Sequence, residues 1–165
     1  MRRIFLGIMF LSMVFLSACE YEVPVVEKHV VDIDPSVLGN WNRIVEGDQS
    51  SDYMLVLPLS ETEYLIKYQT KGNAAVYFRG YPVKLAQRIA VQVEMIGSDK
   101  GPIDSVKRYQ LFAYGVKGKI LTVSIMNTDL IDRTITNSGH LRKEVLRHRD
   151  NKDLFVHQEF YHKLN

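Results

Sequence analysis

The chain has very little cysteine and tryptophan, and beyond Arg3 it has no excess of positive or negative residues. Among its 165 residues there is one cysteine, Cys19, and one tryptophan, Trp41. A single cysteine excludes an internal disulfide bond and a cysteine-based zinc site. The formal net charge of +2 belongs to Arg2 and Arg3, because the other 19 basic residues are balanced by 19 acidic ones. A balanced chain lacks the net positive charge on which nucleic-acid binding depends, so we expect no nucleic-acid partner.

The sequence also lacks the local motifs of common catalytic sites. It contains no G-x-S-x-G elbow, no H-E-x-x-H pair and no glycine-rich phosphate loop. His140, Glu144 and His148 share one face of a predicted helix, but about 12 Å separates histidines two turns apart, which excludes a common metal ion. We therefore expect a protein that is not an enzyme and that uses no metal or cofactor.

The N-terminal apolar run is too short for a confident membrane span. It covers residues 4–16, which is 13 residues, whereas a membrane-spanning helix needs about 20. The run follows Arg2 and Arg3 and has the proportions of a secretory signal peptide. It ends in Leu16-Ser17-Ala18-Cys19. This arrangement resembles the bacterial lipobox, in which the peptide is cut before the cysteine and the cysteine is acylated on its thiol and its new amino group.

The lipobox resemblance implies a lipoprotein signal peptide over residues 1–18 and a lipid anchor on Cys19. Two or three long acyl chains hold a protein on a bilayer effectively permanently, since each buried methylene contributes about 0.8 kcal/mol. Glu20 stands where an aspartate would favour the inner membrane, which implies the periplasmic face of the outer membrane. The alternative location is the outer face of the cytoplasmic membrane. An ordinary secreted protein and an uncleaved anchor are the simpler alternatives to lipidation.

Residues 19–34 are predicted to form the lipidated N-terminus and an extended tether. They are rich in valine and glutamate, and Pro24 excludes a helix around itself. About fifteen extended residues reach roughly 50 Å. Asp34 and Pro35 are typical of the start of a helical turn, which Gly39 ends. We therefore expect a single folded domain over residues 35–165.

Short alternating or apolar runs separated by turn residues predict an antiparallel meander. Val91 and Val93, for example, alternate with Gln92 and Glu94, as in a strand with one buried and one wet face. A helix is predicted over residues 139–149, after the capping residue Asn137, and a last strand closes the chain. The predicted strands cover residues 41–45, 53–59, 63–70, 74–85, 88–96, 106–116, 119–126 and 154–164.

Gly39-Asn40-Trp41 lies between the predicted helical turn and the first strand. It resembles the G-x-W motif of the lipocalin and calycin group, and the order of meander, helix and last strand is similar to that group and to small bacterial lipoproteins with a lipobox. The resemblance implies a mainly β fold, a lipocalin-like barrel or half-barrel of 7–8 strands with a C-terminal helix and a closing strand. It further implies that Trp41 plugs one end. The last strand offers Lys163 in place of the arginine that usually stacks on this tryptophan.

The expected barrel decides the functional hypothesis. An eight-stranded barrel holds one small ligand if side chains do not fill its interior. We therefore expect a lipid-anchored envelope lipoprotein that serves as a small binding module for an apolar or lipid-like ligand. The alternative is a non-catalytic structural or assembly accessory that binds another envelope protein. Four cations of the predicted helix are candidates for contact with the membrane surface: Arg142, Lys143, Arg147 and Arg149.

Overall fold

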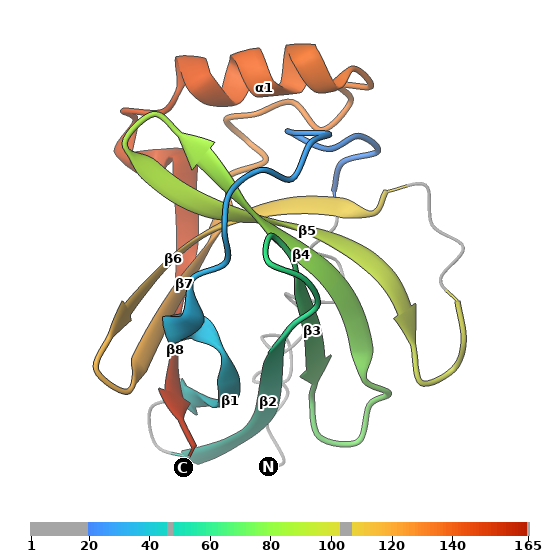
Figure 1. Cartoon of the computed structure of the whole chain (residues 1–165), viewed down its shortest axis with the longest axis vertical. Helices are drawn as coiled ribbons and strands as arrows, with labels where there is room; N and C mark the ends of the chain where they lie inside the picture. The colour runs from blue at the N-terminus through green and yellow to red at the C-terminus, as the bar shows by residue number, and fades with distance from the viewer. Residues whose placement is uncertain (1–19, 46–47, 103–106, 165) are drawn as a thin grey trace, which may run out of the picture.

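The computed structural model describes residues 20–45, 48–102 and 107–164. Within these ranges, eight strands form a closed barrel in which each strand is antiparallel to the next and β8 pairs with β1 (Figure 1). The strands are β1 (Gly39–Val45), β2 (Asp48–Pro58), β3 (Tyr64–Gln69), β4 (Val76–Leu85), β5 (Arg88–Ser98), β6 (Tyr109–Lys117), β7 (Ile120–Met126) and β8 (Phe155–Lys163).

The predicted meander is confirmed, and each predicted strand overlaps one strand of the barrel. The barrel is closed, so the half-barrel is not formed, and the architecture is consistent with a lipocalin-like fold. The predicted helical turn is the 3-10 helix η1 (Pro35–Val37), and the predicted helix is α1 (Ser138–Arg147). Both are capped as expected, because Asp34 accepts a hydrogen bond from Ser36 N and Asn137 accepts one from His140 N, each at 2.9 Å.

The connections define two ends of the barrel. Strands alternate in direction, so β1 begins after η1 at the end that also holds the β2–β3 and β6–β7 connections. We call this the η1 end. The long β4–β5 hairpin curves away from this end and lies beside α1 (Figure 1). The β1–β2, β3–β4, β5–β6 and β7–β8 connections lie at the opposite end. None of the helices in the described ranges is long and apolar enough to cross a membrane.

Two hydrophobic clusters lie on the two sides of the barrel wall. The inner cluster lies inside the barrel and includes Trp41, Phe78 and Val93. The outer cluster covers β4 to β6 on the outside and joins strand residues such as Tyr81 to Leu141 and Val145 of α1. Figure 1 shows α1 and the blue N-terminal segment on this side of the barrel. Apolar side chains on both faces of β4 are therefore packed, those on one face in the inner cluster and those on the other face in the outer cluster.

Residues 20–34 differ from the expected tether. They are extended, but they lie on the barrel wall, and Tyr21 and Val25 are buried in the outer cluster. The Tyr21 hydroxyl donates a hydrogen bond to Ile131 O at 2.8 Å. The described domain therefore includes this segment, which we call the N-terminal strap, instead of beginning at residue 35. Apolar side chains that would be wet in a free tether gain burial here, which favours the packed arrangement.

Gln92 holds the strap on β5. Its side chain is fully buried although it points out of the barrel. The Gln92 Oε1 atom accepts hydrogen bonds from Val25 N at 2.5 Å and Val26 N at 3.2 Å, and Nε2 donates to Val26 O and Tyr81 Oη. The wet face predicted for this strand is thus covered at Gln92, because the strap supplies partners for its amide.

A second polar contact fastens the strap near η1. The His29 ring stacks on the Tyr81 ring with centroids 3.5 Å apart, and its Nδ1 is hydrogen-bonded to Glu63. Arg79 Nη2 donates to the same Glu63 Oε1 at 2.5 Å. The hydrogen bond from Arg79, together with that from His29, lowers the pKa of Glu63 despite its desolvation.

We predict that Gln92→Leu destabilises the protein by about 2–4 kcal/mol, since it leaves two backbone N–H groups and the Tyr81 hydroxyl without this partner. Urea denaturation measures the loss, and limited proteolysis should cut first within residues 20–34. Gln110→Leu is the matched control, because Gln110 is also buried but its Nε2 has no hydrogen-bond partner. Equal losses for the two variants would show that the strap contact is not what Gln92 contributes.

Candidate ligand-binding site

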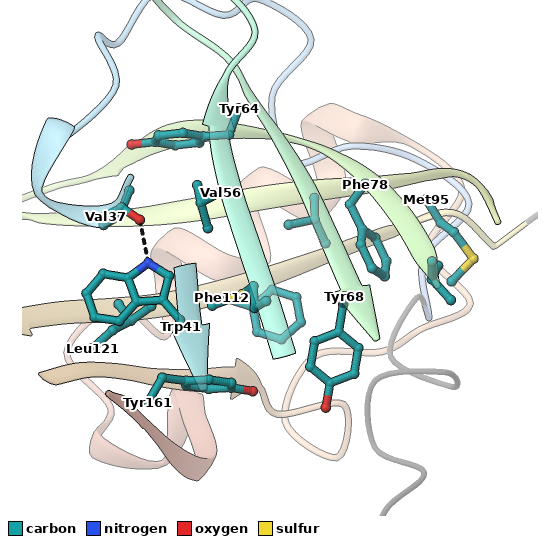
Figure 2. Close-up of a cluster of buried hydrophobic side chains, with 13 residues drawn as sticks. Val37, Trp41, Val56, Tyr64, Tyr68, Phe78, Met95, Phe112, Leu121 and Tyr161 are labelled. Carbon is teal, nitrogen blue, oxygen red and sulfur yellow. Dashed lines mark hydrogen bonds between the residues drawn. The ribbon is translucent and has the colours of Figure 1, made fainter. Parts of the chain in front are cut away.

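The barrel interior contains a cavity of about 70 Å³ that is partly open to the outside. Its wall is built from inward residues of six of the strands together with Val37 of η1, and all of them are aliphatic, aromatic or methionine side chains. Figure 2 shows several of these side chains, with Tyr64 nearer η1 and Tyr68 and Phe78 further along the barrel. The lining residues are Val37, Met54, Val56, Tyr64, Ile66, Tyr68, Phe78, Val91, Val93, Phe112, Tyr114, Leu121 and Val123.

Trp41 lies at the η1 end of the barrel and contacts Val37, which lines the cavity. It is fully buried, and its Nε1 donates a hydrogen bond to Val37 O at 2.8 Å (Figure 2). The Nζ atom of Lys163 lies 5.0 Å from the centroid of the Trp41 ring and donates to Ser36 O at 3.2 Å. Lys163 therefore makes the cation–π contact expected of a cation stacked on this tryptophan. We call Val37, Trp41 and Lys163 the plug.

The plug also explains the glycine of the G-x-W motif. Gly39 has φ +122°, which side-chain-bearing residues rarely adopt, and a Cβ atom there would lie 3.1 Å from Lys163 Cε. Glycine thus allows β1 to start where Lys163 reaches over Trp41. Nearby, the backbone N–H of Asp34 donates to the Tyr64 hydroxyl at 2.6 Å, which links the residue before η1 to the cavity wall.

A polar cluster lies inside the barrel beyond the plug. Arg43 Nη1 contacts Asp52 Oδ2 at 3.1 Å, and Arg43 Nη2 contacts Glu159 Oε1 at 2.7 Å. The Tyr68 hydroxyl donates to Asp52 at 3.3 Å and the Tyr161 hydroxyl donates to Glu159 at 2.7 Å. These five residues, which we call the polar cluster, come from β1, β2, β3 and β8.

Burial and charge both act on the polar cluster. The Arg43 side chain is 17% exposed and each carboxylate side chain is 11% exposed. Burial, and then the charges of Asp52 and Glu159, raise the pKa of the Tyr68 hydroxyl, so it remains a hydrogen-bond donor. Burial lowers the pKa of Arg43, but Glu159 and Asp52 outweigh that effect and the net pKa is raised. One cation thus pairs with two carboxylates, and a tyrosine hydroxyl donates to each carboxylate as well.

We predict that Arg43→Met costs about 3–5 kcal/mol of stability, because removing one partner of a buried ion pair leaves uncompensated charge. Chemical denaturation at neutral pH measures the loss. Arg147→Met is the matched control: Arg147 pairs with Glu144 at 2.5 Å but is 65% exposed, so its loss should cost less than about 1 kcal/mol. Similar losses for both variants would contradict this account.

The buried amide of Gln110 is only partly hydrogen-bonded. Gln110 pairs with Val93 across β5 and β6, and directly opposed residues share a face, so Gln110 points inward beside a cavity-lining residue. Its Oε1 accepts from Leu111 N at 2.8 Å, whereas its Nε2 has no hydrogen-bond partner. Within the described residues, the Gln110 amide thus offers an unused hydrogen-bond donor beside the apolar cavity wall.

The helix residues singled out in the sequence lie away from the cavity. On α1, Leu141 and Val145 face the outer cluster. Arg149 hydrogen-bonds Leu146 O, and His140 Nε2 lies 3.9 Å from Glu144. Among the described residues, no group of three His, Cys, Asp or Glu side chains is arranged to hold a metal ion. The candidate membrane contacts Arg142, Lys143, Arg147 and Arg149 stay a prediction.

Sequence patterns missed the polar cluster, although one pattern points to it. Arg43 is two residues after Trp41 on β1, so the two side chains share the inner face of the barrel. A cation at an inward position requires an acidic partner.

Comparisons of the chain with protein-family models, with curated proteins and with solved structures gave no match.

Proposed function

We propose that the protein is a lipid-anchored envelope lipoprotein whose barrel binds a small apolar ligand. The observation that carries the binding proposal is the cavity of about 70 Å³ inside the closed barrel, next to the plug. Apolar cavities of this kind stay dry and take apolar guests. The anchor rests on Leu16-Ser17-Ala18-Cys19 and on the apolar run before it, which lie outside the described residues.

The cavity limits the size and chemistry of the ligand. Pockets for drug-sized ligands begin at roughly 300 Å³, so a cavity of about 70 Å³ suits a short hydrocarbon or the end of an acyl chain. Val56, Val91, Val93 and Phe112 offer only carbon to such a ligand. The ligand therefore gains affinity from buried apolar area and from little else.

We predict that native mass spectrometry of the membrane-extracted protein finds a bound apolar small molecule. Val93→Phe should remove it, because the larger ring at residue 93 fills the space that the ligand occupies. Val30→Phe is the matched control and should keep the ligand, since Val30 is 77% exposed on the strap. A thermal melt confirms that both variants are folded. Repeated absence of a ligand from the wild type, or its retention by folded Val93→Phe, would contradict the binding proposal.

We predict that Cys19→Ser abolishes labelling by an alkyne analogue of palmitate in the bacterial host and moves the protein out of the membrane fraction. The control adds a cysteine elsewhere in that variant, Cys19→Ser with Ser36→Cys, which should not restore labelling, because acylation requires the cysteine that follows the lipobox. Labelling of either variant would exclude Cys19 as the anchor. The result does not depend on whether the barrel binds a ligand.

The accessory function has one observation in its favour. Ile44 of β1 and Phe160 of β8 pair directly on the outer wall, and both side chains are exposed. An exposed apolar pair of this kind suits contact with another envelope protein. Absence of any ligand from the wild-type barrel would favour this second function.

A further inference from the structure

We propose that the barrel rests directly on the bilayer that carries its anchor, with the end opposite the plug nearest the lipid. The inference rests on the proposed lipidation of Cys19. It concerns the surface where the strap begins. This surface consists of Glu20 and Tyr21, of Lys107 and Arg108 with the first β6 residue Tyr109, and of the loop from Leu130 to Arg133. We call this surface the anchor edge.

Backbone hydrogen bonds fix the start of the strap. Tyr21 N donates to Tyr109 O at 3.1 Å, and Tyr109 N donates back to Tyr21 O at 3.0 Å. Arg108 N donates to Tyr21 O at 3.0 Å, and Glu20 N donates to Tyr109 O at 3.2 Å. The Tyr21 ring is 1% exposed. Residue 21 is therefore part of the folded barrel and cannot act as a spacer.

The chain between the proposed lipid and this fixed point is short. An extended chain spans at most about 3.6 Å per residue, so Cys19 lies within about 7 Å of Tyr21 along the chain. A free tether over residues 20–34 would instead reach roughly 50 Å. Acyl chains on Cys19 must enter the bilayer, and a spacer of about 7 Å draws the anchor edge into contact with the headgroups.

The anchor edge lies at a defined end of the barrel. Tyr109 begins β6 directly after the β5–β6 connection, and Ile131 and Arg133 belong to the β7–β8 connection. Both connections are at the end opposite η1. The plug at Trp41 is thus directed away from the bilayer, and the opposite end of the cavity-bearing barrel is directed toward it.

The anchor edge has a small net charge of +1. It carries three cations, Lys107, Arg108 and Arg133, and two anions, Glu20 and Asp132, and Arg133 pairs with Glu20 at 3.3 Å. The acyl chains, more than attraction to anionic lipid, therefore hold the edge on the membrane, and high salt should not release it. Contact through the α1 cations would instead weaken with salt.

The test measures the height of the two ends above the bilayer. Lipidated full-length protein is reconstituted in phosphatidylcholine vesicles and labelled with a fluorophore at an introduced cysteine, Asp132→Cys at the anchor edge or Lys117→Cys at the η1 end. Lys117 lies eight residues beyond Tyr109 on β6, about 26 Å along the strand. Nitroxide-labelled lipid headgroups should quench the label at residue 132 and leave the label at residue 117 bright, at low and at high salt.

A linker variant supplies the matched control. Fifteen Gly/Ser residues inserted between Glu20 and Tyr21 give a flexible spacer of roughly 20 Å, and quenching at residue 132 should be largely lost. Equal quenching of the two labels without the linker, or unchanged quenching with it, would overturn the inference. Intact-mass analysis before reconstitution separates the two proposals: an unacylated Cys19 overturns both, whereas an acylated Cys19 with equally quenched labels overturns this one alone.

Discussion

The pairing of β1 with β8 is the constraint on which the rest of the structure depends. Four residue pairs, from Trp41 with Lys163 to Ile44 with Phe160, join the first and last strands and leave the sheet without an edge. The same ladder places Lys163 beside Trp41 and Tyr161 beside Arg43. Closure therefore creates the interior and also brings together the two interactions that occupy it, the plug and the polar cluster.

Different interactions stabilise the plug and the polar cluster. At the plug, Trp41 is covered by Val37 and Lys163, so apolar burial is combined with a cation–π contact and one indole hydrogen bond. In the polar cluster, one guanidinium lies between two carboxylates, and each carboxylate accepts a tyrosine hydroxyl as well. The cavity lies between these two regions, because Val37 of the plug and Tyr68 of the polar cluster both line it.

Local pattern predicted most of the fold, because alternation, turn residues and caps are encoded over a few residues. The strand around Val91 and Val93 and the cap at Asn137 are examples. Long-range contacts were not predictable in this way. Gln92 looks like a solvent-facing strand residue until the strap covers it, and residues 20–34 look like a tether because their partners, such as Tyr109 and Ile131, are about ninety or more positions away. The polar cluster likewise needs four strands in register before Arg43 meets Asp52 and Glu159.

The strap links the two ends of the barrel mechanically. It is fixed to β6 at Tyr21, to β5 at Gln92 and to Glu63 at His29, and it then continues into η1 and the plug. Each contact leaves a shorter stretch of free chain before the next contact. Forming the next contact therefore costs less conformational entropy. The chain from Tyr21 to Val37 is thus held on the barrel wall at several points, because each polar contact pairs strap groups with a different part of the barrel.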